Sequence, residues 1–254
     1  MELFYIWLEC IKGLGPSGWH AVLDEFNNPY DVYINKKELV PQGRITPNHV
    51  KLVKENAEDA LERAKAIVEN CKRHNISIIK YDDQQYKNNI REYADFPVVF
   101  YYKGRFSDNW TNGVGIVGAR RCTLQHKETA INITSEMVKK KYPIISGLAK
   151  GIDSYAHTAA IYQDGYTIAV LGFGIDQCYP VEHQKLKCAI AENGLLISEY
   201  PPGTPPSEFR FPRRNRIIAG LSDVLYVVGV KEKSGTRTTI HAAERYKKEI
   251  LIYS

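Results

Sequence analysis

The sequence predicts an α/β protein. We expect an extended Rossmann-like domain with a mainly parallel sheet and helices on both faces, preceded by a small all-helical domain. From residue 76 onward, short apolar runs alternate with helical stretches. These runs are almost wholly apolar, which is typical of strands buried on both faces of a parallel sheet. Before residue 76, apolar residues recur instead at helical spacing.

Residues 1–75 are predicted to form the small helical domain, and residues 76–254 the Rossmann-like domain. The stretch "EDALERAKAIVENCKRHN" has helical spacing and ends at Asn75. Earlier, residues 13–16 (Gly-Leu-Gly-Pro) separate two apolar helical stretches. This turn resembles that of a helix-hairpin-helix or SAM-like module, whose amides can face a DNA phosphate. An ordinary turn in a helical packing module explains it equally well.

The later segment contains the predicted strands. In order they are "ISIIK", "FPVVFYYKG", "VGIVGA", "PIISG", "TIAVLG", "GLLISEY", "DVLYVVGV" and "EILIYS". The proline-rich "EYPPGTPPSEFRFPRR" is predicted to be an extended connection.

Composition and charge limit the possible functions. The 254 residues suffice for one sizeable domain and a small appendage. Five cysteines without a C-x-x-C pair favour a reduced, cytoplasmic protein without a zinc site. The apolar start lacks a basic segment and is interrupted by Glu9, so we expect neither a signal peptide nor a membrane span. We predict no cofactor and no metal.

The positive charge is concentrated in the second part of the chain. Residues 111–254 hold 19 of the 34 Lys and Arg residues and 13 of the 29 Asp and Glu residues, a net charge of +6. This excess favours a polyanionic partner, although a merely solvated basic surface would have the same balance.

The turn after the third predicted strand contains Gly118, Arg120 and Arg121, before a helix expected from about Thr123. "GVGIVG" matches G-x-G-x-x-G, but its first glycines lie within the strand, so we reject a dinucleotide fingerprint. The layout places amides and Arg120 at the carboxyl edge of the sheet, where open α/β folds bind ligands. The alternative is a tight turn with surface arginines.

The next predicted strand ends in "ISGLAKGID". Ser146, Gly147 and Gly151 form a flexible turn whose amides can approach an anion closely. Asp153 is expected to cap the following helix, and His157 to be a packed or exposed helix residue rather than a catalyst.

Aromatic and basic residues follow the fifth strand. Phe173 and Tyr179 offer flat surfaces and Lys185 a cation, as single-stranded nucleic acid requires. Core or loop packing is the alternative for each aromatic residue.

Two further candidate anion sites lie near helix starts. Ser234, Gly235 and Thr236 can bind an anion at a helix N-terminus, or can simply cap that helix. In "FPRRNRIIAG", Pro212 is suited to open a helix, which places cations at the positive end of the helix dipole. We predict that a phosphate backbone is their partner. This basic cluster consists of Arg213, Arg214, Asn215 and Arg216.

The ordered stretches "SGLAKGID", "TIAVLGFGID" with "YP", "LLISEYPPGTPP", "FPRRNRIIAGLSD" and "SGTRTTIHAA" closely resemble the DNA-processing protein A family, DprA or Smf. The resemblance covers about residues 76–250. It implies sequence-independent binding of single-stranded DNA, dimerisation to a homodimer, and loading of the RecA recombinase in natural transformation. It also implies that Arg120 is the phosphate-binding arginine of a Gly-x-Arg turn.

Two departures from the family pattern are present. The family continues beyond the last strand, whereas this chain ends at Ser254, so the Rossmann-like domain is predicted to be short at its C-terminus. Family members often have basic residues after "YP", where this chain has Val181 and Glu182.

The alternative function is that of a nucleotide-binding sensor or an enzyme. Related lysine-decarboxylase-like phosphoribohydrolases carry P-G-G-x-G-T-x-x-E, but Thr239 stands here at the position of the catalytic glutamate. We therefore predict no catalytic residue and no enzymatic activity.

Overall fold

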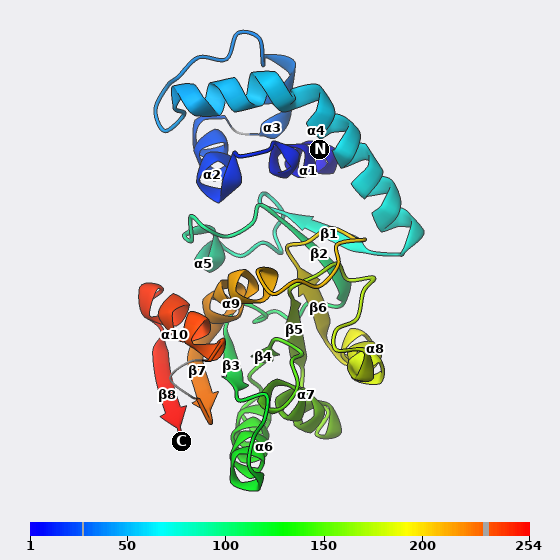
Figure 1. Cartoon of the computed structure of the whole chain (residues 1–254), viewed down its shortest axis with the longest axis vertical. Helices are drawn as coiled ribbons and strands as arrows, with labels where there is room; N and C mark the ends of the chain where they lie inside the picture. The colour runs from blue at the N-terminus through cyan, green and yellow to red at the C-terminus, as the bar shows by residue number, and fades with distance from the viewer. Residues whose placement is uncertain (27, 231–233) are drawn as a thin grey trace. The chain divides into compact units, whose positions relative to one another are not determined.

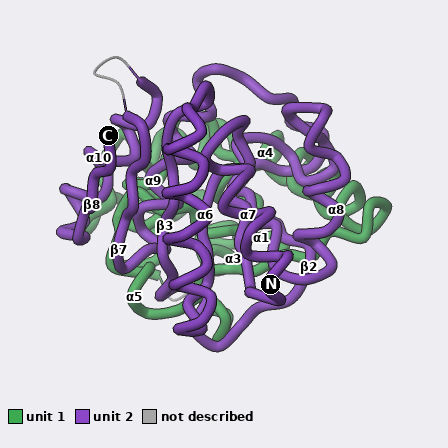
Figure 2. The backbone as a smooth tube through the Cα atoms, turned by 90° about the horizontal axis from the view of Figure 1, so that it is seen from below, with its two compact units in different colours: residues 1–100 green, residues 101–254 purple. Residues whose placement is uncertain are grey.

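The computed structural model describes residues 1–26, 28–230 and 234–254. The chain divides into two compact units, residues 1–100 and residues 101–254, which are coloured separately in Figure 2. The domain boundary predicted between residues 75 and 76 differs from this division and stays a prediction.

The first unit is built around helix α1 (Glu2–Cys10) and the long helix α4 (Pro47–Arg73). Trp7 is fully buried, and its indole Nε1 donates a hydrogen bond to the Ala57 carbonyl at 2.8 Å. The apolar start of the sequence is therefore the core of this unit. Its other elements are α2 (Gly15–Glu25), α3 (Pro29–Ile34), β1 (Ser77–Lys80), α5 (Asn88–Arg91) and the beginning of β2 (Val99–Gly104).

The ends of these helices follow from local sequence. Helix α4 ends at Arg73, two residues before the predicted end at Asn75, and Asn75 itself adopts a left-handed φ of 49°. Gly13 and Gly15 both have positive φ between α1 and α2, which explains why glycine occupies this turn. Its role as a helix-hairpin-helix turn stays a prediction.

The second unit contains the Rossmann-like sheet. Its strands are β3 (Gly113–Gly118), β4 (Ile144–Ser146), β5 (Thr167–Leu171), β6 (Leu195–Ser198), β7 (Ser222–Val228) and β8 (Glu249–Tyr253). The order of the whole sheet is β1-β2-β6-β5-β4-β3-β7-β8. Strands β3 to β8 pair in parallel, and β2 runs antiparallel to β6. The predicted mainly parallel α/β fold is confirmed.

Helices cover both faces of this sheet (Figure 1). One layer consists of α6 (Leu124–Lys139), α7 (Ile152–Tyr162) and α8 (Gln184–Asn193), the last preceded by the short 3₁₀ helix η1 (Val181–His183). The opposite layer consists of α9 (Arg210–Leu221) and α10 (Thr236–Arg245), which pack against each other.

The core lies between β3, β4 and β7 and the first of these layers. It contains Ile116, Ala130, Ile144, Ala156 and Val228, each fully buried. Among the described residues, none of the helices is long and apolar enough to cross a membrane.

Candidate nucleic-acid interface

A pocket of about 540 Å³ lies at the carboxyl ends of β3 and β7. Strand β3 lies between β4 and β7, and the chain leaves β3 towards β4 but leaves β7 towards β8. The connections therefore diverge at this point, and open α/β sheets bind ligands at such switch points. The walls come from the turn after β3 (118–121), the N-terminal part of α9 (211, 212, 214 and 215) and the start of α10 (234–236).

The turn after β3 places its two arginines at the pocket as predicted. Arg120 and Arg121 line the cavity, and both are exposed. The Arg120 guanidinium lies 6.0 Å from the centre of the Phe211 ring. Helix α6 follows from the N-cap residue Thr123, which makes a reciprocal capping box with His126. The predicted strand-turn-helix arrangement is confirmed here.

The start of α10 forms the second wall. Ser234, Gly235 and Thr236 line the pocket, and Thr236 Oγ1 donates to the Gly118 carbonyl at 3.2 Å. This bond joins the two turns at the ends of β3 and β7. The positive end of the α10 dipole therefore lies at the cavity, where an anion is favoured.

Asn215 holds the α10 start in place. Its Nδ2 donates to the Gly235 carbonyl at 3.2 Å and to Thr238 Oγ1 at 2.8 Å. Asn215 also lines the pocket. Asn215, the uncharged residue of the basic cluster, thus joins α9 to α10.

Arg214, which the sequence analysis placed among the cations that face a phosphate backbone, is instead buried. Arg214 is only 4% exposed, and its Nη1 donates to the carbonyls of Gly147, at 2.7 Å, and Val170. Burial lowers the pKa of Arg214 to about 10, although the nearby Asp153 carboxylate acts in the opposite direction. Arg214 therefore forms part of the pocket wall and ties α9 to the ends of β4 and β5.

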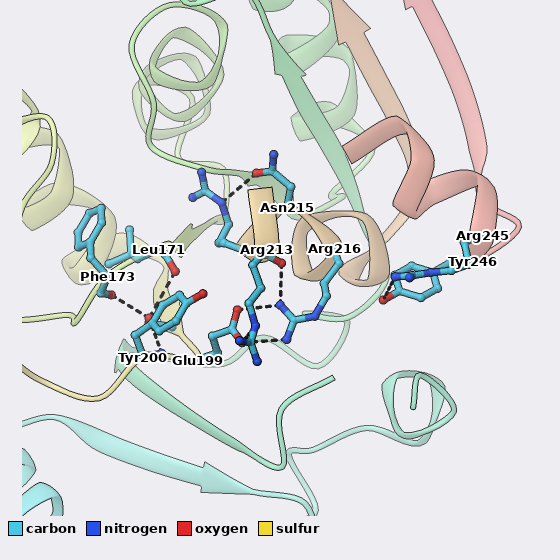
Figure 3. Close-up of polar contacts among 11 residues, drawn as sticks. Leu171, Phe173, Glu199, Tyr200, Arg213, Asn215, Arg216, Arg245 and Tyr246 are labelled. Carbon is cyan, nitrogen blue, oxygen red and sulfur yellow. Dashed lines mark hydrogen bonds and ion pairs between the residues drawn. The ribbon is translucent and has the colours of Figure 1, made fainter. Parts of the chain in front are cut away.

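Arg216 is also placed differently from the prediction. Its Nη1 and Nη2 donate to Glu199 Oε1 and Oε2 at 2.7 and 2.8 Å, and both side chains are buried. Arg213 Nε lies 3.5 Å from the same carboxylate, but its side chain is 49% exposed. Figure 3 shows both arginines pointing towards Glu199. The partner of Arg216 is thus the buried carboxylate of Glu199, the residue that follows β6.

Helix α9 begins at Arg210, two residues before Pro212. The proline therefore lies within the first turn, where its missing N–H is tolerated. The aromatic side chain before it, Phe211, is a pocket residue that sequence analysis missed. Its signal was its position two residues before the basic cluster.

In the turn after β4, the polar groups expected to bind an anion form hydrogen bonds within the protein. Ser146 is fully buried and donates to the Ile116 carbonyl at 2.6 Å. The N–H groups of Gly147 and Ala149 donate to Asp153 Oδ2 at 3.1 and 3.3 Å. Burial raises the pKa of this carboxyl group, while Arg214 and the two N–H donors favour its charged form. The predicted anion contacts of Ser146 and of the Gly147 amide are therefore wrong.

The two glycines of this turn have a packing explanation. A Cβ on Gly147 would lie 2.6 Å from Arg214 Nη2. Gly151 has φ +82°, and a Cβ there would lie 2.2 Å from the Ala119 carbonyl oxygen. Gly151, rather than Asp153, is the N-cap of α7. Both glycines allow close approach of other protein groups.

The residues after β5 divide into core and rim. Phe173 is 1% exposed, so the predicted flat surface at this position is wrong. Tyr179 is 45% exposed, lines the pocket and stacks on Phe211 with ring centres 5.4 Å apart. Lys185 is exposed on α8 and is not among the residues that line the pocket. The cation at the rim is instead Lys150, in a smaller hollow next to Arg120 and Tyr179.

Buried polar residues beneath the pocket behave as packing residues. His157 is fully buried and its Nδ1 lies 2.7 Å from Thr167 Oγ1. Burial lowers its pKa to about 3, so the ring is neutral at physiological pH. The expectation that His157 is packed rather than catalytic agrees with this environment. Thr239, where the related hydrolases carry glutamate, lies 1% exposed in the pocket wall.

Comparison with known families and proteins yields consistent matches. The model of the family described as DNA recombination-mediator protein A matches residues 77–254. Protein Smf of Synechocystis sp. is 39% identical over 187 residues, which cover 72% of this chain and 47% of that protein. DNA processing protein DprA of Bacillus subtilis is 38% identical over 176 residues, covering 69% and 59%. The chain thus spans about half the length of the curated relatives it matches.

Two solved structures are also similar. The X-ray structure of DNA processing protein A from Streptococcus pneumoniae has a TM-score of 0.80 and 30% identity, covering 99% of this chain and 86% of that chain. DNA processing protein A from Helicobacter pylori, described with a unique single-stranded DNA binding mode, has a TM-score of 0.61 and 29% identity. That match covers 70% of this chain and 80% of the other.

Proposed function

This chain belongs to the DNA recombination-mediator protein A family, and from that premise we propose that it binds single-stranded DNA without sequence preference. The binding surface is the pocket at the switch point of the sheet and its rim. Its proposed phosphate contacts are Gly118, Arg120, Arg121, Ser234, Gly235 and Thr236, with Arg213 and Lys185 as further exposed cations.

The observation that carries this proposal is the convergence of three features on one cavity. Two exposed arginines follow β3, the N-terminus of α10 faces the same space, and the stacked rings of Tyr179 and Phe211 lie beside them. Phosphates are bound by cations and helix N-termini, and unstacked bases by aromatic faces. A chain of alternating phosphates and bases matches all three features.

The geometry favours single strands over duplexes. The proposed contacts lie on turns around a concave pocket, whereas duplex readers present the side of a helix or a β-ribbon to a groove. Phosphate contacts and base stacking do not distinguish one base from another, because every nucleotide has the same phosphate and every base has a π-face. We therefore expect tolerance of sequence.

Titrations test this proposal directly. A labelled oligothymidylate, a mixed-sequence single strand of the same length and the matching duplex are each titrated with the protein by fluorescence anisotropy. We expect similar affinity for both single strands, weaker binding of duplex, and weak competition by mononucleotides. Equal affinity for duplex and single strand would contradict the proposal, and tight binding of one mononucleotide would favour the sensor alternative.

We further propose that the protein acts as a homodimer in the cytoplasm and hands single-stranded DNA to a RecA-type recombinase. Support comes from the family resemblance and, for the compartment, from five cysteines that form no disulfide in the described part of the chain. Sedimentation analysis and a strand-exchange assay with purified recombinase test the two partner proposals. A monomer at all concentrations would contradict the homodimer. Failure of the protein to stimulate strand exchange by the recombinase on DNA to which the protein is already bound would contradict the recombinase proposal.

The protein is proposed to bind without turning over its ligand. Thr239 cannot act as the carboxylate general acid or base that the related hydrolases use, because a hydroxyl group titrates far from neutral pH. Release of free base from nucleoside monophosphates by the purified protein would contradict this proposal, provided that Arg120→Ala abolishes the release.

A further inference from the structure

One cation at the rim of the pocket is already paired within the protein. Lys150 lines the smaller hollow beside Arg120, Tyr179 and Phe211. Its Nζ lies 3.0 Å from Glu182 Oε1. Both side chains are largely exposed, at 57% and 67%, so solvent and ligand have access to the pair.

The backbones that carry this pair are fixed to each other. Lys150 follows the turn that Asp153 holds through the N–H groups of Gly147 and Ala149. Glu182 lies in η1, where the next residue, His183, has its Nδ1 3.0 Å from the Leu148 carbonyl oxygen of that same turn. The backbone positions of Lys150 and Glu182 are therefore held close to each other independently of their ion pair.

Two interactions favour the negatively charged form of the Glu182 side chain. A hydrogen bond from its own backbone N–H and the ammonium of Lys150 lower the pKa of its carboxyl group. At neutral pH, a carboxylate therefore lies beside Lys150, which lines the smaller hollow next to Arg120. The exposed ionic residues that line the main pocket are Arg120, Arg121 and Glu208. A like charge at this place repels an approaching phosphate.

We propose that Glu182 is an affinity-setting residue that occupies Lys150 until a phosphate of the bound strand displaces it. The inference rests on the proposed function and goes beyond it, because it assigns a negative regulator to the binding surface. A strand anchored at Arg120 presents further phosphates and can displace the carboxylate. A mononucleotide, which has a single phosphate group, gains much less from the exchange.

The test is the neutral variant Glu182→Gln, with Glu136→Gln as its control. Glu136 forms an equally exposed pair with Lys140 on α6, Oε1 to Nζ 2.6 Å, so the control removes the same charge outside the pocket lining. Because exposed ion pairs contribute modestly, we expect Glu182→Gln to bind oligothymidylate roughly two- to fivefold more tightly at low salt. The gain should shrink at high salt, since exposed charges are screened.

A double-mutant cycle distinguishes local competition from a general charge effect. Lys150→Gln should weaken binding only slightly in the natural protein, but clearly more in the Glu182→Gln background, where Lys150 is free to bind phosphate. Equal effects of Lys150→Gln in both backgrounds would overturn the inference, as would equal gains from Glu182→Gln and Glu136→Gln. Failure of every variant to bind single strands would instead contradict the proposed function.

Discussion

The arginines at the start of α9 differ in environment more than in sequence. Arg213 is half-exposed, Arg214 donates to two backbone carbonyls, and Arg216 is bound by a buried carboxylate. Helical geometry explains this division, because consecutive helix residues point in directions about 100° apart. Only a residue on the outer face of α9 can offer its full charge to a ligand.

The buried pair of Arg216 and Glu199 leads to a stability prediction. Arg216→Ala removes both hydrogen bonds from this guanidinium to the buried Glu199 carboxylate, which keeps the half-exposed Arg213 as a neighbouring cation. Loss of one partner of a buried ion pair costs about 3–5 kcal/mol, so we expect a large fall in the urea midpoint. Arg213→Ala is the matched control and should change stability by only about 0.5 kcal/mol. Similar midpoints for the two variants would contradict the assigned roles.

His157 leads to a prediction of pH dependence. Its pKa is about 3 in the folded protein and about 6.5 when unfolded, so the unfolded state binds more protons between these values. Stability is therefore lost as the pH falls below 6.5, by about 2 kcal/mol between pH 7 and pH 5 from this residue alone.

The variant His157→Gln should lose less of its unfolding free energy over this interval, as followed by urea titrations at each pH. Some loss should remain, because burial also lowers the pKa of His20. The control His74→Gln replaces an exposed histidine and should behave like the natural protein. An unchanged pH profile in His157→Gln would show that the ring is not buried in its neutral form.

At the scale of elements, the pocket depends on how α9 and α10 are joined. Asn215 is the link, through its bonds to the Gly235 carbonyl and to Thr238. It carries no charge, so its effect on DNA binding must act through the position of the α10 N-terminus. The phosphate contacts and their positioning can therefore be separated experimentally.

Asn215→Ala should weaken binding of single-stranded DNA about fivefold, from a lost hydrogen bond of about 1 kcal/mol. The slope of log K against log salt should stay unchanged, because no cation is removed. Asn193→Ala, at the end of α8, is the control and should leave affinity unaltered. A shallower salt slope in Asn215→Ala would indicate that a phosphate-binding cation has moved away.

The elements themselves were predictable because their signals are local. Runs such as "TIAVLG" and "DVLYVVGV" became β5 and β7, since buried parallel strands need apolar residues on both faces. The turn after β3 was also predictable, because a strand followed by glycine, arginines and a threonine cap has few alternatives. The start of α9 was misplaced by two residues because a proline is tolerated throughout the first turn.

Burial of individual polar and aromatic residues could not be predicted in the same way. Phe173 and Tyr179 lie six residues apart after one strand, yet the first is core and the second is at the rim. Ser146 and Gly147 resemble an anion-binding turn in sequence, but Arg214, which fills the space beside Gly147 and binds its carbonyl group, comes from 67 residues further along the chain. Such partners are a property of tertiary packing and have no signal in the local sequence.

At the scale of the whole molecule, the charge asymmetry has a structural counterpart. The unit of residues 101–254 holds the pocket, and all of the positive excess belongs to its sequence. Charge distributed over a surface steers a polyanion towards it, while the cations at the pocket fix where it binds. The exposed cations assigned to the strand are Arg120, Arg121, Arg213 and Lys185. The expected number of phosphate contacts is therefore about four.

The salt dependence of single-strand binding tests this assignment most directly. Oligothymidylate affinity is measured by anisotropy over a range of salt for the natural protein, Arg120→Ala and the control Arg245→Ala, at the opposite end of α10. Each phosphate contact contributes roughly −0.7 to the slope of log K against log salt, so the natural protein and the control should have slopes near −3. The slope of Arg120→Ala should be shallower by just under one unit, and its melting temperature should be unchanged. A flat salt response, or an Arg120→Ala slope equal to that of the natural protein, would contradict the pocket as the site of DNA binding.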